Sequence, residues 1–374
     1  MDNIPVPAPE PLEPRFWSGS TIFFAYLFIC LSLALFAIRS IYTQSAKFPP
    51  QLKSNRGWPT KLLFATLAAI SLSTTWYHMF MFFDWSFKDH LSSGGSEVAF
   101  ASLATPPSPG DLLSASRSPE KLRAEAWLRN TGLFAQAWGA ALDSDARAWW
   151  TLQIFPMATA WGMWLGREGA RRKINLLTML VLTFLGFLVA ISFAMNLSLL
   201  VVLCSRAPRK RPTGSGGSGR QAHGRGRGRQ ETKTQHQNGG NPETEKEEQP
   251  SPWSPTPIDM ILFANALFIP WTTSLLKEGA DRPTDMDFMG PLLLLHVNVV
   301  LLVVGFWVMT GIEMAGFRVP GLLIALILVF PTLINKSDGV LDALGSHPAV
   351  TSVGWDVIMC WISVLAWSFI AADE

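Results

Sequence analysis

The stretch INLLTMLVLTFLGFLVAISFAMNLSLLVVL, Ile174 to Leu203, contains no charged residue and decides the class of fold. It is longer than the roughly 20 apolar residues that a membrane-crossing helix needs. The composition of the whole chain also favours a membrane protein, since 49% of its residues are hydrophobic, only 16% are charged, and the mean hydropathy is +0.24. We therefore expect an integral membrane protein whose main contact is the lipid bilayer.

Further apolar blocks on both sides of this stretch predict an all-α, polytopic membrane helix bundle. The short basic turn GREGARRK joins the stretch to the block before it, which indicates a helical hairpin. The sequence predicts about eight transmembrane helices, at residues 21–41, 62–83, 149–165, 174–203, 258–276, 292–310, 319–334 and 353–370.

The composition changes sharply between residues 205 and 257, where a Gly/Arg/Ser-rich run precedes an acidic, Pro-rich one. Such a segment cannot bury enough apolar surface to form a core. We expect a disordered linker there, between a first membrane half at 21–204, which follows a tail at 1–20, and a second half at 258–374. The net charge of +2 gives no reason to expect a nucleic-acid partner, and the Arg-rich run is better explained as a solvated tether.

The segment WLRNTGLFAQAWGAALDSDARAWW, Trp127 to Trp150, has too many charges for a span and too many rings for a loop. We expect an amphipathic helix over residues 120–142, lying in the headgroup region, after the start signal Ser118-Pro119. On it, Trp127, Phe134 and Trp138 would share one face. Two interpretations remain open: the helix anchors the chain, or it forms a lid over an opening between the spans.

The runs WLRNTGLFAQAW, RAWW and WLGREGARR resemble a family of fungal multi-pass membrane proteins, and TTWYHMFMFFDWSF and AISFAMNLSLLVVL fit it too. The resemblance covers residues 60–204 well and the second half only by its pattern of spans. The family includes the membrane-bound terpene cyclases of ascochlorin, ascofuranone and macrophorin-type meroterpenoid pathways. It implies an endomembrane enzyme, of the endoplasmic reticulum or a related membrane, that closes a ring in a prenyl chain, often an epoxidised one. The family pattern has Asp where Asn130 stands, which argues against a catalytic role at this position.

Cyclisation of a prenyl chain needs a protonated carboxyl group, aromatic faces beside the developing cation, and the exclusion of water. No metal or cofactor is expected, because the substrate keeps its atoms and oxidation level. The best-placed acids are Asp84 in MFFDWSF and Glu313 in WVMTGIEMAGF; Asp356 is another candidate, and Glu168 is expected to form a salt bridge. The predicted substrate-binding residues, for an apolar prenylated molecule, are His78, Trp85, Trp127, Phe134, Trp138 and Asn196.

Two other classes of function stay open at this stage. The segment EGADRPTDMD contains Asp281, Asp285 and Asp287, which could hold magnesium and a diphosphate as membrane prenyltransferases do, although no second such motif is present. A transporter or a non-enzymatic scaffold would need no catalytic acid at all. An isomeric product of unchanged mass would distinguish the cyclase from the others.

Overall fold

The computed structural model describes residues 19–46, 58–95, 119–205, 257–282, 285–308 and 339–372. These residues are helical and include no strand, which confirms the all-α prediction. One compact unit comprises Met1–Ala207 and Ala266–Glu374, and a second comprises Pro208–Asn265. The candidate acid Glu313, the predicted span 319–334 and nearly all of the predicted linker lie outside the described residues.

Three of the described helices are long and apolar enough to cross a membrane. The apolar segments are Thr21–Thr43 in α1 (Gly19–Ala46), Met286–Val308, which is α11, and Pro348–Ile370 in α14 (Pro348–Ala372). These are fewer than the eight spans that the sequence predicts. The other predicted spans within the described residues correspond to shorter or more polar helices, among them α2 (Trp58–His90), α7 (Ile154–Arg171) and α10 (Pro257–Glu278).

The prediction of one continuous span over residues 174–203 is wrong. The stretch forms two helices, α8 (Leu176–Leu188) and α9 (Ile191–Cys204), separated at Val189 and Ala190, and Ala190 is extended with φ −167° and ψ 135°. The Arg172 guanidinium donates a hydrogen bond to the Val202 carbonyl at 2.9 Å, so the end of α9 returns to the start of α8. Each helix rises only about 20 Å, too short to cross a hydrocarbon core of about 30 Å. We call this pair the α8–α9 hairpin.

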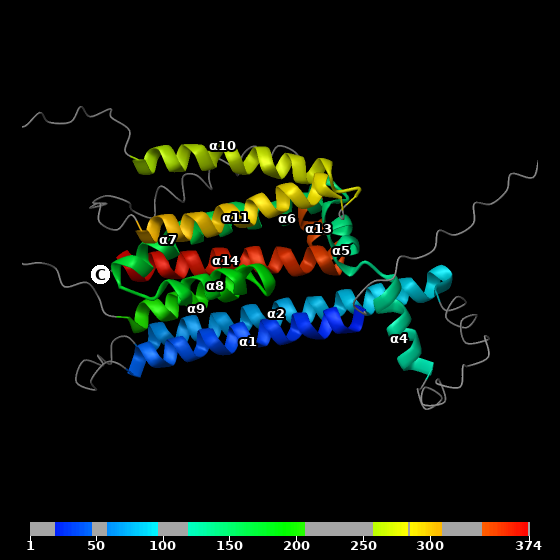
Figure 1. Cartoon of the computed structure of the whole chain (residues 1–374), viewed down its shortest axis with the longest axis horizontal. Coiled ribbons are helices and arrows are strands. Elements are labelled where there is room, and N and C mark those ends of the chain that lie inside the picture. The colour runs from blue at the N-terminus through cyan, green and yellow to red at the C-terminus, as the bar shows by residue number, and fades with distance from the viewer. Residues whose placement is uncertain are drawn as a thin grey trace, which may run out of the picture. The chain divides into compact units, whose positions relative to one another are not determined.

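Around the hairpin, α1, α2, α7, α11 and α14 run side by side in one bundle (Figure 1). The close approach of α7 to α11 depends on two glycines, since a Cβ atom on Gly162 would lie 2.9 Å from the Val299 side chain and one on Gly166 would lie 2.5 Å from the Val303 carbonyl oxygen. Small residues at this spacing let the backbones of apolar helices meet. The bundle thus has a tightly packed core on this side.

The expected interfacial helix begins at Pro119, as predicted, but it is not continuous. It divides into α4 (Pro119–Asn130) and α5 (Leu133–Leu142), because Gly132 takes a non-helical conformation with φ −81° and ψ 76°. Trp127 therefore lies on a different helix from Phe134 and Trp138, whose rings share a face of α5 with centroids 6.2 Å apart. The next predicted span, 149–165, likewise divides into α6 (Asp145–Leu152), which Ser144 caps, and α7. A short α13 (Val340–Ser346) precedes α14, and a π-helical turn, Leu91–Gly95, follows α2.

Candidate functional site

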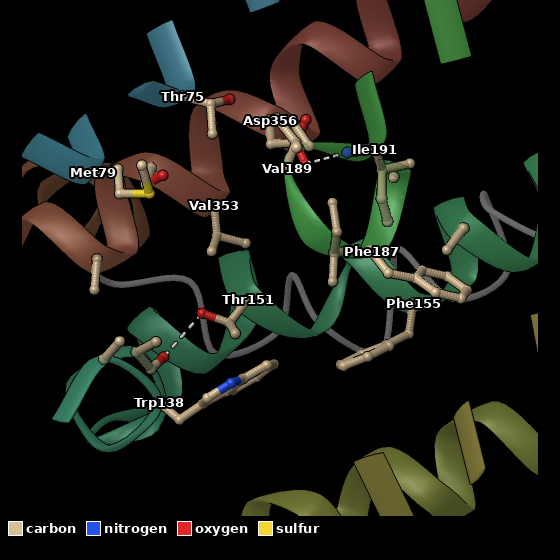
Figure 2. A pocket seen from close by; sticks show the side chains of 18 of the residues that line it. Thr75, Met79, Trp138, Thr151, Phe155, Phe187, Val189, Ile191, Val353 and Asp356 are labelled. Carbon is tan, nitrogen blue, oxygen red and sulfur yellow. Dashed lines mark hydrogen bonds between the residues drawn. The ribbon is translucent and has the colours of Figure 1, made fainter. Parts of the chain in front are cut away.

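A cavity of about 300 Å³ lies at the tip of the α8–α9 hairpin. Its walls come from α2, α5, α6, α7, α11, α14 and the residues at the hairpin break, and the side chains around it are mostly apolar (Figure 2). The volume falls at the lower end of the range for small-molecule sites. A cavity built by so many segments from both halves of the chain is the best-defined candidate for a ligand site.

Four rings form a continuous wall on one side of the cavity. Trp138 of α5 stacks on Phe155 of α7 with ring centroids 6.3 Å apart and an interplanar angle of 13°. Phe155 meets the edge of His296 on α11 at 6.4 Å, and His296 in turn meets Phe187 of α8 at 4.6 Å. The wall runs from the hairpin tip to α5. These rings make one side of the cavity aromatic.

Asp356 of α14 supplies the carboxyl group of the cavity and also holds the hairpin tip. Its two oxygens accept hydrogen bonds from the backbone N–H groups of Ile191 and Ser192, each at 2.9 Å (Figure 2). These N–H groups belong to the first two residues of α9. Asp356 therefore caps this helix although it lies 165 residues away from Ile191 in the sequence. On α1, the Tyr26 hydroxyl donates to the carbonyl of Leu188 at the end of α8. The backbone that the break exposes is thus satisfied by side chains from α1 and α14.

The charge of Asp356 has little compensation inside the cavity. The side chain is buried, with 8% of the residue exposed, and no Lys or Arg is present among the described residues that line the cavity. The N-terminus of α9 offers a partial positive charge, equivalent to about half an elementary charge. A carboxyl in this position either carries a proton or requires a cationic partner.

His296 is the second group in the cavity that can exchange a proton. Its Nδ1 lies 2.7 Å from the carbonyl oxygen of Leu292. A carbonyl can only accept, so Nδ1 carries the hydrogen of this bond and Nε2 keeps its lone pair in the neutral ring. His296 is therefore prepared to act as a proton acceptor.

One side of the cavity is covered by α5, through Ala137, Trp138 and Ala141. At its first turns the helix is fastened to α2, where Ser86 donates to the Gln136 side chain at 2.5 Å and Gln136 donates to Asp89 at 3.3 Å. The indole N–H of Trp127 on α4 donates to the same Ser86 hydroxyl at 3.1 Å. We call these four residues the latch.

The far end of α5 is fastened by Arg147 of α6. Its guanidinium donates to the Ala140 carbonyl at 3.4 Å, to Asp143 at 3.2 Å and to Ser346 of α13 at 3.0 Å. Polar bonds therefore hold both ends of α5, while its middle presents Trp138 to the cavity.

Comparison with family models, curated proteins and solved structures finds no match to this chain. Its function is therefore argued from the cavity and the residues around it.

The acids singled out from the sequence lie in different surroundings. Asp84 is half exposed and pairs with Lys88 at 2.7 Å on the same helix, and it does not line the cavity. Glu168 forms the expected ion pairs, with Arg171 at 2.8 Å and Arg172 at 3.2 Å. Asp356 alone of these three lies in the cavity wall.

The predicted substrate-binding residues are dispersed over the bundle. Trp138 lines the cavity, and Trp127 takes part in the latch. Phe134 is 47% exposed, and Trp85 lies edge-on to His347 with centroids 4.3 Å apart.

The two polar candidates near the middle of helices also lie outside the cavity lining. His78 contacts the ring of Tyr77, and Asn196 is fully buried, where its amide donates to the Ser192 carbonyl at 2.9 Å. Asn196 therefore stabilises α9 rather than facing the cavity.

Sequence reasoning did not assign Phe155, Phe187 and His296 to the site. His296 had a usable signal, since it stands in the apolar run LLLLHVNVVLL, where an ionisable residue suggests function. Phe155 and Phe187 had none, because each is one of 24 phenylalanines in the chain.

The aspartate-rich segment after α10 does not form a metal site among the described residues. Asp281, Asp285 and Asp287 are exposed, and no group of three His, Cys, Asp or Glu residues in the described part of the chain is arranged to hold a metal ion. The prenyltransferase alternative gains no support from these residues.

Proposed function

We propose that this protein is a membrane-integral isomerase of the endomembrane system that closes a ring in an apolar prenyl chain. The observation that carries the proposal is the pairing of Asp356 with the aromatic wall inside one apolar cavity. The all-helical fold with three membrane-length helices and the family resemblance of residues 60–204 support it. We further propose that the first and second halves both contribute membrane spans, about seven in all, because the α8–α9 hairpin replaces the predicted span 174–203.

In the proposed reaction, the protonated carboxyl of Asp356 donates its proton to the epoxide oxygen, or to the terminal alkene when no epoxide is present. As the epoxide C–O bond breaks, the π electrons of a nearby alkene form the new C–C bond, and a carbocation results. His296 Nε2 then accepts a proton from a carbon next to the cation, which leaves an alkene. Water carries this proton from His296 back to Asp356 between turnovers, so the product is an isomer of the substrate.

The cavity also suits the cationic intermediate. Each aromatic face that meets a desolvated cation contributes about 2 kcal/mol, and the Asp356 carboxylate left by proton donation adds an opposite charge. Closure of α5 over the cavity would keep out water, which would otherwise capture the cation.

The test is expression of the chain in microsomes supplied with a panel of epoxyfarnesyl phenols, followed by chromatography and mass spectrometry. We expect a new product of unchanged mass, formed without added magnesium. Asp356→Asn should abolish formation of this product. Asp84→Asn, which changes an exposed ion pair, should not. Glu313→Gln tests the remaining candidate acid. No product from any substrate, or full activity in Asp356→Asn, would refute the proposal.

One observation favours a second function, that of a transporter. Broken helices whose ends meet a binding site near the middle of a bundle are typical of secondary transporters, and the α8–α9 hairpin has this form. Proteoliposomes that contain the purified chain would accumulate a labelled prenyl compound without changing it chemically. Uptake without isomerisation would favour this alternative.

A further inference from the structure

Asp356 makes the cavity selective for charge as well as for shape. When its carboxyl group is ionised, the negative charge faces the backbone N–H groups of Ile191 and Ser192, which are dipoles rather than cations. Among the described lining residues there is no Lys or Arg to complete the neutralisation. A buried carboxylate in this condition gains strongly from a cationic group placed beside it.

The rest of the wall matches a soft, weakly hydrated cation. The rings of Trp138, Phe155 and Phe187 line the cavity, and aromatic faces bind quaternary ammonium groups in preference to neutral groups of the same size. A hydrated metal ion would instead need several oxygen ligands, which the described part of the chain does not gather.

We propose that the cavity is a binding site for lipophilic ammonium ions, with the cationic head between Asp356 and the rings of the aromatic wall and the apolar tail in the rest of the apolar lining. This rests on the proposed function for the nature of the tail, because the ammonium head replaces the carbocation that cyclisation would form there. Binding itself requires no reaction. A stable ammonium compound with a prenyl tail is therefore expected to bind whether or not the chain turns over a substrate.

The experiment compares geranyltrimethylammonium with its neutral isostere, in which carbon replaces the nitrogen, on the full chain in nanodiscs. Binding is followed by calorimetry. We expect the cation to bind at least about tenfold more tightly than the isostere. Asp356→Asn should reduce this ratio to about one, while Asp342→Asn, at an exposed position of α13, should leave it unchanged.

Two further variants test the inference even if the Asp356→Asn protein does not fold. Phe155→Leu removes a ring of the wall and should lower the ratio about threefold, whereas Phe28→Leu removes an exposed ring of α1 outside the cavity and should not. Equal binding of the two compounds to the wild-type chain would overturn the inference. Preferential binding of the cation together with no isomerisation of any epoxide would support it and refute the cyclase, and binding of neither compound would refute both.

Discussion

Two helix breaks in the described part of the chain, at residues 189–190 and 131–132, are held in different ways. At Val189 and Ala190 the break is buried, and its backbone is satisfied by Tyr26 and Asp356, which are far away in sequence. At Thr131 and Gly132 the break is half-buried to exposed, and the helix that follows is fastened by polar side chains near its ends. The first arrangement fixes one wall of the cavity with buried bonds, and the second holds the cover over that cavity, so we expect the cover to open more readily than the hairpin.

The largest expected effect comes from removing the cap of the buried break. Asp356→Ala leaves the N–H groups of Ile191 and Ser192 buried without acceptors, and we expect a loss of about 2–4 kcal/mol in the free energy of unfolding. Unfolding of the purified protein in mixed detergent micelles measures it. Asp342→Ala on α13 serves as the control, and an unchanged stability of Asp356→Ala would mean that the hairpin does not need this cap.

A matched pair of glycine substitutions compares the two breaks directly. A Cβ atom on Gly186 would lie 2.9 Å from the ring of Trp161, whereas on Gly132 its nearest neighbour would be the Ala135 Cβ at 3.7 Å. Gly186→Ala should therefore cost about 1–3 kcal/mol through overpacking. Gly132→Ala should remain within about 0.5 kcal/mol of the wild type. Equal effects in the same unfolding assay would remove the distinction between the breaks.

Weakening the latch should change motion more than stability. Gln136→Leu removes a part-buried bond to Ser86 and an exposed bond to Asp89, so we expect a loss of about 1 kcal/mol in the free energy of unfolding. Hydrogen exchange of residues 133–142 should nevertheless become faster, while exchange in α9 stays unchanged. Faster exchange in both segments would show that the cover and the hairpin move as one body.

The smallest expected effect is a pH response at the far end of the cover. Burial lowers the pKa of His347 below its ordinary value of 6.5; nearby Arg147 lowers it further, and Asp143 opposes them. The unfolded chain therefore binds more protons, so stability is complete above pH 6.5 and falls as the pH drops below it. In the wild type, the Ala349 N–H donates to the His347 side chain at 3.2 Å. His347→Asn keeps a side-chain acceptor for this N–H but removes the titrating ring. The loss of stability below pH 6.5 should therefore become smaller. A profile that keeps its slope in the variant would assign the response to another group.

The sequence predicted the helical class, the start of α4 at Pro119 and the salt bridges of Glu168, because each depends on neighbours in the chain. It could not predict the α8–α9 break. Val189 and Ala190 are apolar and neither is Gly or Pro, so nothing local distinguishes them from a continuing span.

The composition of the site could not be predicted either, because it depends on contacts between residues far apart in the sequence. Asp356 was a visible candidate, but its role depends on Ile191 and Ser192, and no periodicity relates these positions. Trp138 was selected for a face shared with Trp127 and Phe134, but the break at Gly132 places Trp127 on another helix, and Trp138 lines the cavity as part of α5.

The central claim is that the cavity under α5, between the hairpin tip and Asp356, holds the ligand. Photolabelling tests it most directly: a prenyl chain that carries a diazirine is irradiated with the full chain in nanodiscs, and the labelled peptides are mapped by mass spectrometry. The account predicts adducts within residues 137–141, 186–191 and 349–356, suppressed by an excess of geranyltrimethylammonium. Adducts confined to the exposed apolar face of α1, or unaffected by the competitor, would contradict it.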